Sequence, residues 1–420
     1  MENKEQFADF FNNLLFTKIF QSFLISIQLS KLIIALLAVG AIFFAGWIMD
    51  FSKTVVVMPD TQGKTTELQI YIADPGQFKS FLENYKTKNE GAGVFITLWP
   101  FVCEKLHGIS NSLFELNFAG VFNNVTEYLK ALKWAFRYHF VYLTIFLTIR
   151  LVVIAVAAGA ICRAAAMQFA RGERPGVGES LRFGIKKFKS FFAAPLIPLV
   201  IIILAGLPIF LLGLLGNIPR IGELIISIFM PLVLIAGFAI TVIAIGAIAG
   251  FNLMFPAIAY DNSDCLDAIS RSFSYVYAKP WRMCFYTAIA AVYGAICYVF
   301  VRFFAFLLLW TVHLFLRLGT WTNDSSSQFN KLTAIWSGPT FANLAGQSVQ
   351  AAHNWSESFA AFMLHLNVLV IIGLVISFFI SFYFSANTII YSLMRNRLDN
   401  TPLQKIYMPS ENNENGPAAK

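Results

Sequence analysis

The stretch PAIAYDNSDCLDAISRSFSYVYAKPWR, residues 256–282, decides how this sequence folds, because it is a polar segment set between two long apolar runs. Pro256 is expected to end the first run as a helix, since proline cannot continue the hydrogen-bond ladder. Asp264 is a good N-cap for a new helix, and Pro280 is expected to end that helix. The apolar residues between them recur at the helical period and predict one buried face: Leu266, Ile269, Phe273, Val276 and Tyr277.

Charged and aromatic residues define the rest of this element. Asp267 and Arg271 are four residues apart on the polar side and can pair weakly. Trp281 and Arg282 form an aromatic and basic anchor typical of a membrane interface. We therefore predict an amphipathic elbow helix that lies along the membrane surface between two spanning helices. Its acidic and basic residues balance, which favours a structural hinge over attraction to charged lipid.

An earlier segment, RGERPGVGESLRFGIKKFKSFF (residues 171–192), follows the same plan. Pro175 and Gly176 predict a turn, and apolar residues at helical spacing predict a second elbow helix. The two elbows lie about 88 residues apart, which indicates an internal repeat. The first elbow is strongly basic, and its candidate lipid or partner contacts are Arg182, Lys186, Lys187 and Lys189. These cations either contact anionic lipid or only set the orientation of the chain.

Bulk composition places the whole chain in a membrane. Of 420 residues, 57% are hydrophobic and 13% are charged, whereas soluble domains carry roughly a quarter charged residues. The net charge of +8 does not indicate nucleic acid, because the densest basic cluster lies beside a membrane segment. A spanning helix needs about 20 apolar residues. Six stretches qualify, at about residues 29–49, 140–169, 191–215, 221–255, 283–316 and 362–391.

We therefore predict an all-α membrane protein with about six transmembrane helices, two cytoplasmic amphipathic elbow helices and a small extracytoplasmic cap. Basic residues favour the cytoplasmic side, which places both termini and both elbows in the cytoplasm of a bacterial cell with the chain in its inner membrane. The predicted segments are a cytoplasmic amphipathic helix (1–28), a first span (29–50), an extracytoplasmic region (51–138), a core of four spans and two elbows (139–317), an extracytoplasmic loop (318–361), a sixth span (362–394) and a cytoplasmic tail (395–420).

Three local expectations accompany this scheme. Apolar residues before the first span (Phe7, Phe10, Phe11, Leu14 and Leu15) predict an interfacial helix or a plain helical lead-in. Lys31 is close enough to the start of the first span to snorkel to the surface. The region 51–138 begins with two short strands around residues 61–64, and neither outer region is large enough for an independent catalytic domain with its own core.

Arg150 and Arg302 interrupt apolar helices, and an intramembrane charge is a functional hypothesis by default. Each lies about 20 residues from a cytoplasmic basic anchor, roughly 30 Å along a helix, and can therefore reach the outer interface. We expect interfacial anchors, with a buried substrate contact as the alternative. Apolar sequence continues beyond each arginine, so the two extensions either pack together outside or belong to strongly tilted helices.

Candidate chemistry is sparse. His353 and Glu357 are four apart, but no second histidine completes a zinc motif. No pair of carboxylates falls within an apolar run. We expect no catalytic residue, metal or cofactor. Prolines and the Gly246–Gly250 spacing in the third and fourth spans indicate either close helix packing or the broken helices of a transporter.

Three stretches resemble known patterns. The stretch FPAIAYDNSDCLDAISRSFSYVYAKPWR, from Phe255, and the stretch ARGERPGVGESLRFG, from Ala170, are similar to the elbows of the membrane domain associated with glycerophosphodiester phosphodiesterases. NTIIYSLMRNRLDNTPLQKIY, from Asn387, resembles a recurrent ending among bacterial polytopic membrane proteins. The phosphodiesterase catalytic domain has no counterpart here, so the resemblance implies a membrane fold and no activity.

The sequence thus favours a non-enzymatic integral membrane protein that organises lipids or partner proteins at the cytoplasmic membrane. The alternative is a small-solute or lipid transporter. Its expected partners are membrane lipids, anionic lipid among them, or other membrane proteins.

Overall fold

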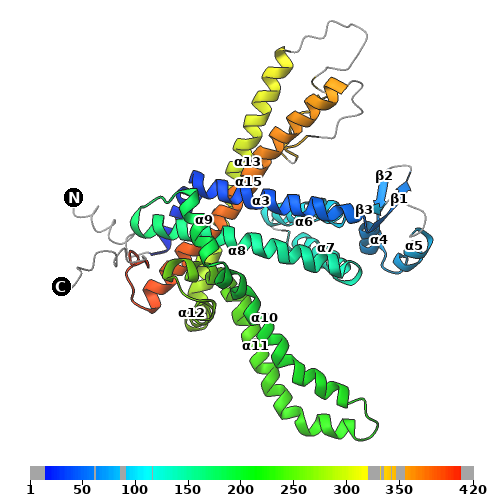
Figure 1. The fold of residues 1–420 in the computed structure, drawn as a ribbon, viewed down its shortest axis with the longest axis vertical. Helices are drawn as coiled ribbons and strands as arrows, with labels where there is room; N and C mark the ends of the chain where they lie inside the picture. The colour runs from blue at the N-terminus through cyan, green and yellow to red at the C-terminus, as the bar shows by residue number, and fades with distance from the viewer. Residues whose placement is uncertain are drawn as a thin grey trace, which may run out of the picture. The chain divides into compact units, whose positions relative to one another are not determined.

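The structure is a computed structural model that describes residues 15–60, 63–85, 91–115, 117–319, 332, 335–341, 343–346 and 355–407. The chain forms two compact units (Figure 1). One unit is Gly40–Val153, and the other combines Met1–Val39 with Ile154–Lys420. We call them the inserted unit and the main unit. Of the predicted cytoplasmic helix (1–28), residues 1–14 lie outside the described residues. Its remaining part forms a 3-10 helix, η1 (Leu15–Gln21), and α2 (Ser22–Ser26), through which the chain enters the main unit.

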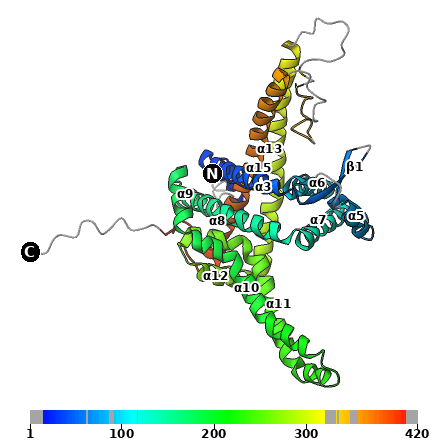
Figure 2. The same cartoon turned by 45° about the vertical axis from the view of Figure 1, so that its right-hand side comes forward.

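Six helices of the described chain are long and apolar enough to cross a membrane, as predicted. They are α3 (Leu29–Met49), α8 (Phe140–Arg171), α10 (Phe188–Leu215), α11 (Gly222–Asp261), α13 (Pro280–Gly319) and α15 (Trp355–Leu398). The protein is therefore an all-α membrane protein. α10 and α11 pack side by side as a hairpin around the turn at residues 216–221 (Figure 2).

Both predicted elbows are helices: α9 (Val177–Lys186) follows α8, and α12 (Cys265–Ala278) follows α11. They lie at the same end of the spans, because Lys187 donates a 2.9 Å hydrogen bond to the carbonyl of Asn262, between α11 and α12. We call this end of the main unit the elbow face. The ends of α11 and α15 and the start of α13 lie there too.

The prediction that Pro256 ends the fourth span is wrong. α11 continues through Pro256 to Asp261, and Asn262 stops it with a left-handed φ of 54°. Membrane helices tolerate internal proline because neighbouring groups satisfy the freed backbone. Asp264 occupies the N-cap position of α12, and Pro280 occupies the first position of α13, where its missing N–H costs nothing.

The buried face of α12 is also rotated from the predicted one. Ile269 and Val276 are buried, but Leu266 is 64% exposed. The helix instead turns small residues inward, and Ser272 packs against Gly250, where an added Cβ would lie 3.3 Å from the serine Cβ. Small residues face α11 because the two helices approach closely there. The prediction considered only large apolar side chains and therefore missed this face.

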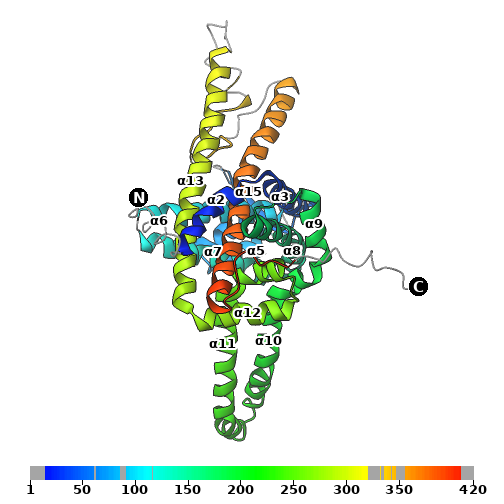
Figure 3. The same cartoon turned by 90° about the vertical axis from the view of Figure 1, so that its left-hand side faces the viewer.

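The core of the main unit lies at the elbow face, between α8, the end of α11 and the end of α15. α8 contributes small residues such as Ala158, Cys162 and Ala165, which allow the helices to approach closely. Tyr260 and Tyr391 fill the remaining space as fully buried aromatics. η1 and α2 pack against α15, and η1 also contacts α13 (Figure 3).

α13 and α15 are 40 and 44 residues long, so each is about 60 Å or more in length, about twice the bilayer core. Away from the elbow face they pack on each other through Leu309 and Val368, and on Trp336 and Leu344 of the connecting segment. The apolar sequence beyond Arg302 therefore packs against α15 and the connecting segment; packing against the extension beyond Arg150 stays a prediction.

The inserted unit holds the predicted strand pair. β1 (Val55–Asp60) and β2 (Gly63–Thr66) are antiparallel, with Val57 opposite Thr66, and a short β3 (Gly91–Ala92) adds to the other edge of β1. A 3-10 turn, η2 (Asp50–Ser52), precedes β1. The helices are α4 (Glu67–Ala73), α5 (Phe78–Tyr85), α6 (Val94–Phe114) and α7 (Phe118–Tyr138).

This unit does have its own hydrophobic core, contrary to the sequence expectation. Val55, Leu68, Phe78, Val94 and Trp134 pack together, each at most 1% exposed. The core forms because residues of β1, α4, α5, α6 and α7, far apart in sequence, converge. The individually short apolar segments did not indicate this convergence.

Candidate functional site

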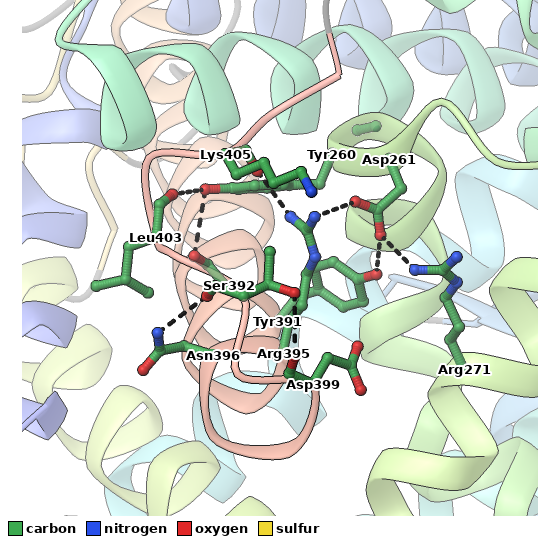
Figure 4. A network of polar contacts seen from close by, with 12 residues as sticks. Tyr260, Asp261, Arg271, Tyr391, Ser392, Arg395, Asn396, Asp399, Leu403 and Lys405 are labelled. Carbon is green, nitrogen blue, oxygen red and sulfur yellow. Dashed lines mark hydrogen bonds and ion pairs between the residues drawn. The ribbon is translucent and has the colours of Figure 1, made fainter.

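A network of buried charged and tyrosine side chains occupies the elbow face (Figure 4). Asp261, the last residue of α11, forms ion pairs of 3.2 Å with Arg395 of α15 and 3.2 Å with Arg271 of α12. It also accepts a hydrogen bond from the Tyr391 hydroxyl. The single carboxylate thus joins three helices.

The same network holds the chain that follows α15. Arg395 donates a 2.8 Å hydrogen bond to the carbonyl of Lys405, and the Tyr260 hydroxyl donates to the carbonyl of Leu403. Arg163 of α8 donates to the carbonyls of Tyr407 (2.8 Å) and Ala259 (3.0 Å). We call Arg163, Tyr260, Asp261 and Arg395, with the segment 403–407, the tail clamp.

The clamp contacts the segment 403–407 through its backbone carbonyls. Tyr407 closes it by donating its own backbone N–H to the carbonyl of Tyr260 at 3.1 Å. Arg163 and Arg395 are 7% and 9% exposed. Arg163 lies inside α8 and is buried.

α12, which lies outside the spans, contacts the clamp through Arg271, the partner of Asp261. Arg271 forms the predicted i,i+4 pair with Asp267, with its Nε 3.0 Å from the carboxylate. Burial lowers the pKa of Arg271, but its hydrogen bond to Asp267 and the nearby acidic charges outweigh burial and raise it. Burial, followed by the hydrogen bond to Asp399, raises the pKa of Tyr275, so this phenol stays protonated and donates to Asp399.

The charged groups of the clamp are occupied by contacts within the protein. The Asp261 carboxylate is occupied by two guanidinium groups and a hydroxyl, and the arginines donate to carbonyls and carboxylates. Within the described chain no group of three or more His, Cys, Asp or Glu residues is placed to hold a metal ion. The arrangement is therefore suited to connecting helices and to fixing the chain after α15.

The four basic residues predicted on the first elbow divide into two sets. Arg182, Lys186 and Lys189 are exposed, and none lies within 4.0 Å of a carboxylate in the described part of the chain. Lys187 is half-buried and is committed to the second elbow, where it contacts the Asn262 carbonyl and lies 3.7 Å from Asp264.

α9 is held firmly under this basic surface. A Cβ added to Gly184 would lie 2.4 Å from the Val156 carbonyl, so the backbones of α9 and α8 meet there. Phe183 packs under the guanidinium of Arg163, 4.9 Å from its ring centroid. Arg182 and Lys186 thus lie on a helix whose other side is fixed to the core, and Lys189 follows at the start of α10.

Arg150 and Arg302 have different surroundings. Arg150, in the inserted unit, is exposed. Arg302 of α13 donates a 3.0 Å hydrogen bond to the Phe341 carbonyl and lies 5.2 Å from the Phe341 ring centroid. The structure brings Arg302 to the segment between α13 and α15.

Lys31 does not snorkel as expected. It is fully buried, and its Nζ donates to the Ile25 carbonyl at 2.7 Å and to Gln168 of α8 at 2.6 Å. Ile25 belongs to α2, so the Lys31 side chain joins α2 at the entry of the chain to α8. No pattern near Lys31 in the sequence indicated this contact.

The Gly246–Gly250 pair does permit close packing, but against α12 and not against another span. A Cβ at Gly246 would lie 2.9 Å from the Tyr277 hydroxyl. The buried residues of α10 are Phe191, Ala194 and Pro198, all near its start. The part of the α10–α11 hairpin considered for transport is thus exposed along most of α10.

Sequence reasoning missed the clamp. Arg271 was paired with Asp267 from their spacing, but nothing local joins Arg271 to Asp261 or Asp261 to Arg395. The available signal was a charged residue within or at the end of an apolar run, as at Arg163 and Asp261. Comparisons with known proteins add no assignment: no family model, no curated protein and no solved structure matches this sequence.

Proposed function

We propose that the chain is a non-enzymatic integral membrane protein of the bacterial cytoplasmic membrane that organises anionic lipids, or a partner protein, through the first elbow. The elbow face lies on the cytoplasmic side in this proposal. The observation that carries it is the exposed basic surface of α9 and its junction with α10, formed by Arg182, Lys186 and Lys189 without a carboxylate partner in the described residues.

The two elbows differ in whether their basic side chains pair with carboxylates of the protein. On α12, Arg271 is shared between Asp261 and Asp267, which supports the prediction of a structural hinge. At the first elbow, Arg182 and Lys186 of α9 and Lys189 at the start of α10 are exposed, and α9 is fixed at Gly184. Charges that the fold does not use internally are available to an external anion.

Lipid is the partner that these surroundings favour. Ile185 is 64% exposed beside the cations, and an interfacial helix pairs such an apolar residue with basic neighbours. Each cation near an anionic membrane surface contributes about 1 kcal/mol. Three would contribute about 3 kcal/mol, roughly a hundredfold in affinity.

The test removes all three charges in the full chain. We expect R182Q/K186Q/K189Q to weaken binding of phosphatidylglycerol by between tenfold and a hundredfold, measured by native mass spectrometry of the detergent-solubilised protein. The matched control is K130Q/K133Q/R137Q, which removes the same three charges from the exposed surface of α7. Unchanged lipid binding, together with an unchanged pull-down of membrane proteins, would refute the proposal.

A further inference from the structure

An open cleft of about 450 Å³ lies where η1 meets the start of α13 and the end of α15. Its walls are aromatic. Phe16 of η1 and Phe285 of α13 are in edge-to-face contact with centroids 5.9 Å apart, and Trp281 and Tyr286 line the same space. We call it the interfacial cleft.

Two guanidinium groups, those of Arg282 and Arg397, also line the cleft. Both residues are exposed, and neither lies within 4.0 Å of a carboxylate among the described residues. Arg395, two positions before Arg397, points to the opposite side of α15, since two residues turn a helix by about 200°. Arg395 forms the ion pair with Asp261. Arg397 lines the cleft instead.

The cleft lies at the end of two spans. Trp281 and Arg282 directly follow Pro280, the first residue of the α13 span, and Arg397 lies in the last turn of the α15 span. Trp281 is 88% exposed. Exposed tryptophan and arginine at span ends belong at the level of the lipid headgroups.

We propose that the interfacial cleft binds an anionic phospholipid, with its phosphate held between Arg282 and Arg397 and its glycerol and upper acyl chain on Phe16 and Phe285. Guanidinium groups match phosphate geometry through paired N–H donors. Basic pockets between membrane helices recognise lipid headgroups in this way. The inference rests on the proposed function for its ligand class, but it assigns a surface separate from Arg182, Lys186 and Lys189.

The mixed aromatic and basic lining of the cleft favours a lipid over a free anion. A small anion would use the two arginines and leave the aromatic walls uncovered, whereas an amphiphile covers both. The exposed apolar side chain of Phe285 extends the wall along α13 in the direction of the span. An acidic peptide is the other occupant that the test must separate.

The first experiment compares affinities. We expect R282Q/R397Q to lose about thirtyfold in phosphatidylglycerol affinity, about fivefold for each arginine, with little change for phosphatidylcholine. The control K130Q/R137Q removes the same number of charges from α7. If phosphatidylglycerol affinity falls in R182Q/K186Q/K189Q but not in R282Q/R397Q, the cleft is not a lipid site and the proposed function stands. The reverse result upholds the cleft and overturns the proposed role of the first elbow.

The second experiment identifies the occupant without removing any charge. A photo-crosslinking amino acid is placed at position 285 in the full chain, in nanodiscs of equal phosphatidylglycerol and phosphatidylcholine. Position 228 is the control, since Ile228 of α11 is 72% exposed. We expect phosphatidylglycerol to be enriched at position 285 over position 228. Equal ratios, or adducts with a peptide of this chain, would overturn the inference.

Discussion

Asp261 and Arg395 form a 3.2 Å ion pair in which each side chain is only 10% exposed. The pair joins the end of α11 to the end of α15, and Arg395 also holds the carbonyl of Lys405. Removal of one partner of a buried pair is costly, because the other is left without compensation. The elbow face should therefore depend on this contact more than on any surface pair.

Asp261→Ala should lower the free energy of unfolding by about 3–5 kcal/mol, because it leaves Arg395 buried and unpaired. Asp267→Ala is the matched control, since it breaks an exposed i,i+4 pair with Arg271 worth about 0.5 kcal/mol. Chemical unfolding in detergent measures both. Similar losses in the two variants would show that the Asp261–Arg395 pair is not the central contact.

The tail clamp should protect the chain after α15 from proteolysis. Arg163→Gln removes the hydrogen bonds to Tyr407 and Ala259, and a charged hydrogen bond contributes about 1.5–3 kcal/mol. We expect trypsin to cut after Lys405 at least tenfold faster in this variant. Arg171→Gln, which breaks only an exposed pair with Glu173 at 3.5 Å, should leave the rate unchanged; equal rates in the two variants would argue against the clamp.

Gly184 should be required for the position of α9. Gly184→Ala places a Cβ 2.4 Å from the Val156 carbonyl, and the overpacking should cost about 1–3 kcal/mol. Gly178→Ala, in the same helix, meets nothing within 4 Å and serves as the control. Thermal unfolding should separate the variants, and a Gly184→Ala protein as stable as the control would contradict the close approach of α9 and α8.

Glu67 should stabilise the inserted unit. Its buried carboxylate accepts from the backbone N–H of Val56 at 2.9 Å and lies 2.7 Å from Nε2 of His139. Glu67→Ala leaves both groups without their acceptor, at about 1–3 kcal/mol each. Hydrogen exchange at Val56 should accelerate at least tenfold, whereas Glu104→Ala, which removes an exposed partner of Lys105, should not change it. No acceleration in Glu67→Ala would contradict the assigned contact.

The sequence was sufficient for features that depend on local chemistry. Runs of about 20 apolar residues predicted all six spans, and α3 begins and ends at the predicted residues, Leu29 and Met49. The elbows followed from turn residues and helical periodicity, and the strand pair near Gly63 followed from β-forming residues around a turn.

Features that depend on distant partners were not predicted. The contacts between Arg163 and the Tyr407 carbonyl, and between Lys31 and Gln168, join backbone and side chains that no local pattern relates. Pro256 was misread because a proline inside a packed membrane helix looks the same in sequence as one that ends a helix. The basic residues of α9 were found, but only the structure separates Lys187 from the three exposed cations.

The most direct test of the account is the sidedness of the two elbows. Single cysteines at positions 186, 279 and 133, in a chain whose native cysteines are replaced, are labelled with a membrane-impermeant maleimide in intact spheroplasts and in inverted vesicles. The account predicts that positions 186 and 279 react only in inverted vesicles and position 133 only in spheroplasts. Reaction of positions 186 and 279 from opposite sides would contradict it.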